Sequence, residues 1–152
     1  MIRKILMAFV LCLSFSSHAN AYGPFGLGIV IAGPTGLSAN YFYEKQKSLA
    51  MAVGWGHSDV QVHVDHLWYR GDLIVVDRVP IDVYMGLGLH LHTIDKKYKD
   101  DETQIGVRVP VGVSYIFRKI PVQLFGELAP ALILVEESAF NIDIALGIRY
   151  YF

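Results

Sequence analysis

The last thirteen residues of the chain alternate without interruption between two kinds of side chain. The large apolar set is Phe140, Ile142, Ile144, Leu146, Ile148, Tyr150 and Phe152, and between them stand Asn141, Asp143, Ala145, Gly147, Arg149 and Tyr151. A period of two is that of a β-strand, whose successive side chains point to opposite faces of the sheet. The pattern therefore predicts one long, two-faced strand that ends at Phe152.

The same period recurs in seven further segments. Residues 105–117 and 81–92 show it most clearly, with large apolar side chains on one face. The alternation is weaker in Leu27–Ala32, Leu37–Tyr43, Leu49–Trp55, Val60–Tyr69 and Val122–Leu134. The connections are residues 33–36, 44–47, 56–59, a stretch within 71–80, 93–104, 118–121 and 135–139. Such short links favour antiparallel hairpins, so the chain is predicted to be all-β with eight strands.

The first 21 residues follow a different plan. Arg3 and Lys4 precede the apolar run Ile5–Phe15, and a stretch of small and polar residues then ends in Ala21. This is the three-part arrangement of a secretory signal peptide, and an apolar run of eleven residues is too short for a spanning helix, which needs about 20. We expect a cleavable signal peptide over residues 1–21 and one domain over residues 22–152.

Composition excludes several classes of function. The only cysteine, Cys12, lies in the predicted signal peptide, so no disulfide or cysteine-ligated metal is expected after cleavage. Without Arg3 and Lys4, 11 basic residues remain against 14 acidic ones, a net charge of −3, and no nucleic-acid partner is expected. Mean hydropathy is nevertheless high, at +0.39, although no long apolar run follows residue 21. A membrane-spanning β-structure accounts for both observations.

Side-chain size indicates what each face of the predicted sheet meets. The apolar face is uniformly large, whereas the other is rich in Gly, Ala and Ser, as a narrow barrel interior requires. We therefore predict an eight-stranded antiparallel up-and-down transmembrane β-barrel whose apolar face meets lipid. The alternative is a soluble periplasmic ligand-binding barrel of the lipocalin type, with its bulky apolar residues inside.

Aromatic residues gather toward one predicted rim. If the carboxyl terminus is periplasmic, the hairpins traced backward from it bring seven outward aromatic residues near that rim. They are Tyr41, Tyr43, Trp68, Tyr115, Phe117, Tyr150 and Phe152. Aromatic residues are common in strands generally, but a shared rim and a shared outward phase predict an aromatic girdle at a membrane interface.

Several stretches resemble known sequences. Residues 144–152, with Ile148, Tyr150 and Phe152 in phase, resemble the carboxyl-terminal β-signal that the barrel assembly machinery recognises in bacterial outer-membrane proteins. The stretches 33–39 (GPTGLSA), 107–112 (VRVPVG) and 147–152 (GIRYYF) resemble a family of small outer-membrane barrels related to the OmpA-like type. The resemblance implies a location in the bacterial outer membrane, among lipid and lipopolysaccharide. It carries over no functional residue.

Six charged residues fall on the predicted inward face. They are Asp65, Asp82, Arg108, Glu127, Asp143 and Arg149. Unpaired charge is costly in such a space. Arg108 and Asp143 flank Ala131 on neighbouring strands, so we expect them to form a salt bridge. We predict a polar plug that fills the lumen, and a gated pore, proton path or narrow channel is the alternative.

A second ion pair follows from the predicted register of the last hairpin. With Leu134 opposite Phe140, Glu127 lies diagonally across from Arg149, within reach of long side chains. We therefore expect a Glu127–Arg149 pair. Together with Arg108 and Asp143, it would form an interior lock.

Three histidines share the inward phase. His63, His90 and His92, with Asp65, offer the donor types of a metal site or of a general base. His90 and His92 point the same way, but nothing in the sequence sets their height relative to His63. We therefore expect ordinary interior or rim histidines, with no metal and no cofactor.

Two features at the outer rim raise other functions. His57, Ser58 and Asp59 have the residue types of a hydrolase triad, but neighbours in a short turn cannot readily converge. No enzymatic activity is predicted, and a barrel hydrolase or acyltransferase acting on lipid A or phospholipid is the alternative. The charged connection 93–104 offers lysines to lipopolysaccharide phosphates and carboxylates to divalent ions. The predicted role is structural or in surface interaction.

Overall fold

The computed structural model describes residues 23–33, 35–56, 59–76, 79–94, 102–117, 119–135 and 139–152. The predicted signal peptide and most of the charged connection 93–104 lie outside these ranges. Within them, no helix has the length and apolar character needed to cross a membrane.

The described elements are strands, and they follow the predicted alternation. They are β1 (Phe25–Ala32), β2 (Gly36–Glu44), β3 (Lys47–Trp55), β4 (Asp59–Val76), β5 (Val79–Ile94), β6 (Glu102–Arg108), β7 (Val111–Ile116), β8 (Val122–Ile133) and β9 (Ala139–Tyr151). β6 and β7 are two parts of one strand, because both keep the same register against β5 and β8 across Val109 and Pro110. The eight predicted segments therefore correspond to eight strands of the barrel wall.

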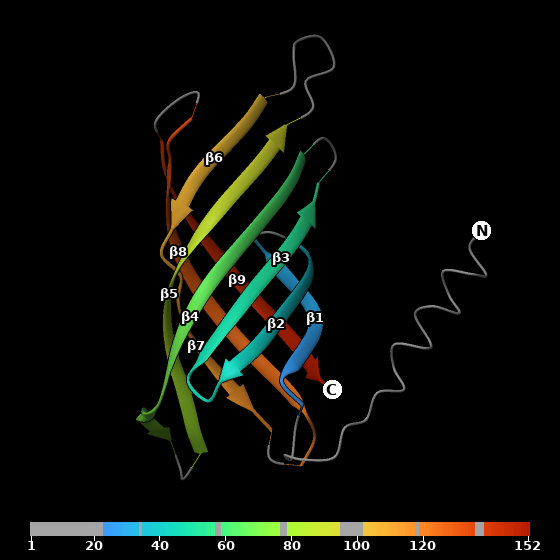
Figure 1. Ribbon diagram of the computed structural model, residues 1–152, viewed down its shortest axis with the longest axis vertical. Coiled ribbons are helices and arrows are strands. Elements are labelled where there is room, and N and C mark those ends of the chain that lie inside the picture. The colour runs from blue at the N-terminus through green and yellow to red at the C-terminus, as the bar shows by residue number, and fades with distance from the viewer. Residues whose placement is uncertain are drawn as a thin grey trace, which may run out of the picture.

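The sheet closes on itself. Successive strands pair antiparallel, and β1 pairs with β9 from Gly26 opposite Tyr151 to Ala32 opposite Ala145 (Figure 1). At this seam the two backbones come close together, because a Cβ placed on Gly28 would overlap the backbone oxygen of Ile148. The fold is thus the predicted eight-stranded up-and-down barrel. Its strands are tilted to the long axis.

The turn expected within 71–80 lies between Val76 at the end of β4 and Val79 at the start of β5, which pair with each other. One predicted detail of the strands is wrong. In the last hairpin Leu132, not Leu134, lies opposite Phe140. A shift of two residues leaves every side chain on its own face, so alternation predicts the face of a residue but not its partner across the hairpin.

The predicted orientation of the two faces is confirmed. On the outer face of β9, Phe140 is 68% exposed and Leu146 is 54% exposed. On its inner face, Ala145 and Tyr151 are each 3% exposed. The other strands repeat the pattern, so large apolar side chains form a continuous outer belt. The interior is left to small, polar and charged residues, together with a few aromatic ones.

Candidate functional site

Aromatic side chains fill the interior at the end of the barrel where the chain terminates. The ring of Phe42 lies 5.0 Å from that of Tyr69 and 5.8 Å from that of Tyr151, and Tyr69 lies 5.1 Å from Tyr84. Phe125 belongs to the same buried apolar cluster as Tyr69 and Tyr84. We call these five residues the aromatic plug. Interdigitated rings of this size occupy the narrow bore of an eight-stranded barrel.

Arg108 is the centre of a charged cluster in the interior. It lies at the end of β6, fully buried. Its Nε atom is 3.3 Å from Asp65 Oδ1, its Nη1 donates to His63 Nδ1 at 2.8 Å, and its Nη2 donates to Glu127. These residues come from β4, β6 and β8. Asp65 and Arg108 lie opposite the same residue of β5, Gly88, so the glycine leaves room for the two side chains to meet. A guanidinium has five donors in a fixed fork, which suits it to several partners at once.

Glu127 and Asp143 complete this cluster. Tyr84 of the aromatic plug donates to Glu127 Oε2 at 3.0 Å, so the plug and the charged cluster are joined. Asp143 Oδ2 lies 3.9 Å from Arg108 Nη1, which is the longest ionic contact of the guanidinium. The structure therefore brings together Arg108 and Asp143, as expected, but Arg108 interacts more closely with Asp65 and Glu127. The Arg108 guanidinium thus lies within ion-pair distance of three carboxylates, so acidic groups outnumber arginines in the cluster.

Arg149 forms a separate polar group. Its Nε and Nη2 donate to Ser38 Oγ at 2.9 and 2.8 Å, and its Nη1 donates to Gln123 Oε1 at 3.3 Å. Its guanidinium carbon also lies 3.9 Å from the centre of the Phe125 ring, a cation–π distance. The expected pair with Glu127 is wrong. In the observed register Arg149 lies opposite Gln123. Glu127 lies opposite Ala145, which is four residues before Arg149 on β9.

The remaining predicted residues lie away from this cluster. Asp82 is half-buried and lies opposite Ser114. Arg108 lies opposite Gly88, so Asp82 is six residues away from it along β5. The seven girdle residues all have the predicted outward phase. Tyr41, Tyr43, Trp68, Tyr150 and Phe152 are exposed, and Tyr115 and Phe117 are half-buried. Their location at a membrane interface, and recognition of the final strand by assembly machinery, stay predictions.

Each inward histidine lies beside a different carboxylate. His63 Nε2 is 3.6 Å from Asp65, His90 Nδ1 is 3.5 Å from Asp143, and His92 Nε2 is 3.2 Å from Asp59. Because His63 Nδ1 accepts from Arg108, the proton of a neutral His63 ring is on Nε2, toward Asp65.

One group of possible metal ligands is compact. Atoms of His63, Asp65 and Glu127 lie within 4.8 Å of one another. The guanidinium of Arg108 contacts all three and stands where a cation would lie. A metal ion would meet a fixed positive charge there, so the geometry favours an arginine-centred network over a metal centre.

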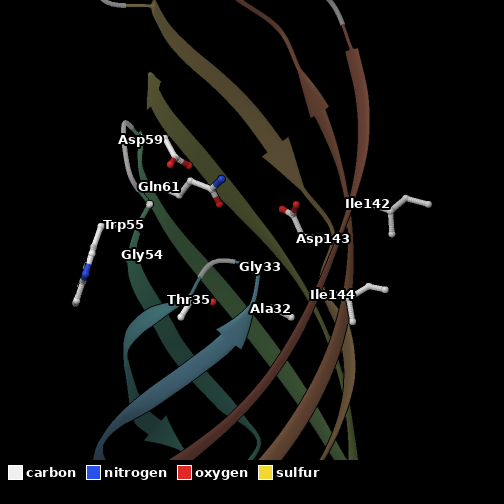
Figure 2. Close-up of a pocket in the computed structure, with 11 residues that line it drawn as sticks. Ala32, Gly33, Thr35, Gly54, Trp55, Asp59, Gln61, Ile142, Asp143 and Ile144 are labelled. Atoms are coloured by element: carbon white, nitrogen blue, oxygen red, sulfur yellow. The ribbon is translucent and has the colours of Figure 1, made fainter. Parts of the chain in front are cut away.

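A cavity of about 510 Å³ opens at the opposite end of the barrel. Its polar lining comprises Thr35, Asp59, Gln61 and Asp143, and its apolar lining includes Trp55, Ile142 and Ile144. Figure 2 shows Asp59, Gln61 and Asp143 directed inward, while Ile142, Ile144 and Trp55 point away from the lumen. Gly33 and Thr35, in the turn between β1 and β2, bound it on one side. We call this cavity the side notch.

Two earlier candidates are only partly described. His57 and Ser58 of the possible triad lie outside the described residues, and Asp59 contacts His92. Within the charged connection, residues 95–101 lie outside them as well. A lipid-modifying activity, and contacts of this loop with lipopolysaccharide or divalent ions, therefore stay hypotheses.

Sequence reasoning missed several interior residues. Tyr84 joins the aromatic plug to Glu127, and Gln123 Oε1 accepts from both Tyr151 and Arg149. Their inward phase was a usable signal, since both residues alternate with large apolar neighbours. The side notch had no such signal, because it depends on the relative lengths of hairpins.

Comparisons with known proteins agree with this architecture. No protein-family model matches the chain. No curated protein matches it either. Among solved structures, it is similar to the N-terminal β-barrel domain of Pseudomonas aeruginosa OprF, with a TM-score of 0.56 and 16% identity over 84% of this chain and 95% of that one. It is also similar to Neisserial surface protein A (NspA), with a TM-score of 0.51 and 16% identity over 84% and 93%. At this level of identity the likeness establishes the shared barrel fold.

Proposed function

We propose that this chain is an integral outer-membrane β-barrel with a closed lumen and a structural or surface-interaction role. The continuous outer belt of apolar side chains around a closed sheet carries the proposal. Such a belt is costly in water, whereas a bilayer solvates it. A soluble ligand-binding barrel needs the reverse arrangement, with large apolar residues inside and charges outside.

Two interior features support a closed lumen. The aromatic plug occupies the bore near the carboxyl terminus, and the Arg108 cluster lies next to it, joined by the Tyr84–Glu127 hydrogen bond. Eight-stranded barrels have interiors narrow enough for side chains to fill. We therefore propose that the barrel does not act as a channel. The likeness to NspA, which is named as a surface protein, is consistent with a surface role.

Two measurements test the proposal. Membranes separated on a sucrose gradient should place the protein in the outer-membrane fraction, and the unheated, detergent-refolded protein should migrate differently from the heated protein on a gel. In planar bilayers the folded barrel should give no stable conductance steps. Recovery in the soluble periplasmic fraction would overturn the membrane location, and steady ohmic conductance would overturn the closed lumen.

A further inference from the structure

A group of basic and aromatic side chains lies on the outer face of the barrel, beside the turn between β2 and β3. The turn is at the end of the barrel where the chain terminates (Figure 1). β4 passes it with Trp68 opposite Lys47, and Tyr69 N donates to Gln46 O at 2.8 Å. β4 continues past the turn, so its next outward residue, Arg70, lies beside it. We call the group the basic rim, and its members are Tyr43, Lys45, Lys47, His66, Trp68 and Arg70.

Three aromatic rings form the side of the basic rim that adjoins the apolar belt. The Tyr43 hydroxyl is hydrogen-bonded to His66 Nε2, and the two ring centres are 5.7 Å apart. The centre of the Trp68 ring is 4.4 Å from that of His66. Leu49 and Leu87 flank His66 on the neighbouring strands, and both are exposed. The rings therefore stand where the apolar outer surface gives way to charged side chains. Aromatic residues occupy this position at the head-group level of membrane proteins.

The charged part of the basic rim has an excess of cations. Lys47 Nζ lies 2.9 Å from Glu44 Oε2, so this lysine already has a partner. Lys45 and Arg70 are exposed, and neither forms an ion pair with the residues that the structure describes. The predicted mature chain has 11 basic residues against 14 acidic ones, so the local excess of positive charge does not follow from a basic composition.

The position of these cations selects the chemistry of their partner. If the chain spans a membrane as proposed above, the basic rim lies in the head-group layer, where the anionic groups are lipid phosphates. Clusters of lysine and arginine beside a membrane attract anionic lipids. A guanidinium can donate two parallel hydrogen bonds to a phosphate, and a lysine adds a compact charge. A zwitterionic lipid with a cationic head group satisfies these side chains less well, because its own ammonium lies beside its phosphate.

We propose that the basic rim binds the head group of an anionic phospholipid, an inference that rests on the membrane location proposed above. The phosphate lies between Lys45 and Arg70, and the upper part of the acyl chains packs against Trp68 and Leu49. The hydrogen bond between Tyr43 and His66 holds the aromatic rings in place beside it. The charged connection 93–104 leaves β5 at the opposite end of the barrel, so the two basic regions meet different leaflets.

The two tryptophans of the chain are matched reporters of lipid contact. Trp68 belongs to the basic rim, and Trp55 is exposed on the outer face at the other end of the β3–β4 pair. Trp55→Phe leaves Trp68 as the reporter, and Trp68→Phe leaves Trp55 as the control. Each protein is reconstituted into phosphatidylcholine vesicles with a rising fraction of bromine-labelled phosphatidylglycerol or bromine-labelled phosphatidylcholine. Quenching of Trp68 should show about a fivefold preference for phosphatidylglycerol, the factor for one cation at an anionic surface. Quenching of Trp55 should show none.

Charge variants of the Trp68 reporter protein assign the preference to the basic rim. Arg70→Gln and Lys45→Gln should each lower it to about twofold, and the double variant should abolish it. Glu44→Gln should raise it, because Lys47 loses its counter-ion and becomes available to the phosphate. Lys119→Gln is the control, since Lys119 is exposed in the turn between β7 and β8 at the same end, and should leave the preference unchanged. Heat-modifiable gel mobility verifies that each variant is folded.

The outcomes separate this site from the membrane location itself. Equal quenching of Trp68 by the two lipids, or the same preference at Trp55, would overturn the site and leave the barrel in the membrane. A preference that survives in the folded double variant would also contradict the site. If neither lipid quenches either tryptophan, the protein does not enter the bilayer, and the proposed membrane location fails together with the site.

Discussion

A single buried guanidinium compensates most of the negative charge inside the barrel. Arg108 contacts Asp65, Glu127 and, more distantly, Asp143. Removing one partner of a buried ionic group is more costly than its net contribution suggests, because the remaining charges keep their desolvation penalty. Here the remaining charges are carboxylates that would also repel one another.

The first prediction concerns this residue. Arg108→Met should lower the free energy of unfolding by about 3–5 kcal/mol, because it leaves buried carboxylates without their cation. Urea unfolding followed by heat-modifiable gel mobility measures the change. Arg70→Met is the matched control, since Arg70 is exposed and its loss should change stability by less than about 0.5 kcal/mol. Equal stability of the two variants would show that the cluster does not depend on Arg108.

A second prediction at this scale concerns the seam between β1 and β9. Gly28→Ala should prevent the closed barrel from forming, because the new Cβ would overlap the backbone oxygen of Ile148, and backbone cannot move aside as a side chain can. Gly126→Ala is the control, since its Cβ would meet only Leu146 Cδ2, at 3.2 Å. The fraction of protein with heat-modifiable mobility after refolding measures the outcome. Efficient refolding of Gly28→Ala would contradict the close approach of the two strands.

At the scale of elements, β9 is the strand at which the barrel closes. It closes the sheet against β1, pairs with β8, and leaves its first residues without a described neighbour at the side notch. Phe152, the residue after β9, continues the pairing with β1, because Phe152 N donates to Phe25 O at 2.9 Å. The side chain of Phe152 is 42% exposed and contributes little to this pairing.

The third prediction separates assembly from stability. If the final strand is recognised by assembly machinery, Phe152→Ala should lower the cellular yield of heat-modifiable barrel severalfold, while refolding of the purified protein in detergent stays close to the parent. Phe140→Ala, an exposed aromatic at the other end of β9, should change neither. Parallel losses in cells and in detergent would indicate a purely structural role for Phe152.

At the scale of the whole molecule, the distribution of side chains is inverted relative to a soluble barrel. The largest apolar side chains face outward, and the interior holds two arginines, several carboxylates and a group of tyrosines. The interior is stable only because nearly every charge has a partner. Under the proposed function, the lipid of a bilayer solvates the apolar exterior.

The fourth prediction tests whether the apolar outer face lies in a bilayer. Leu146→Arg, at the middle of β9, should destabilise the barrel in lipid vesicles by about 2–4 kcal/mol, whereas Phe140→Arg, near the end of the strand, should cost about 0–1 kcal/mol. Reversible denaturant unfolding in vesicles measures both. A soluble barrel would tolerate arginine equally well at both exposed positions. Equal effects of the two substitutions would therefore contradict the proposed membrane location.

Alternation along the chain was sufficient to predict the strands, their inward and outward faces and the closed barrel. The physical reason is local, because each strand has a period of two and a barrel interior has room only for the smaller face. The six interior charges were predicted on the correct face for the same reason. Glycines at the seam and the apolar phase of β9 are likewise visible in the sequence.

Tertiary structure decided which of these residues meet. A slip of two residues preserves every face, so the pattern could not distinguish the predicted Glu127–Arg149 pair from the observed contact of Glu127 with Arg108. The side notch likewise depends on how far β1 extends beside β9, which is a property of two strands from opposite ends of the chain. Faces are set by neighbours in sequence. Partners and openings are set by the register that the closed sheet adopts.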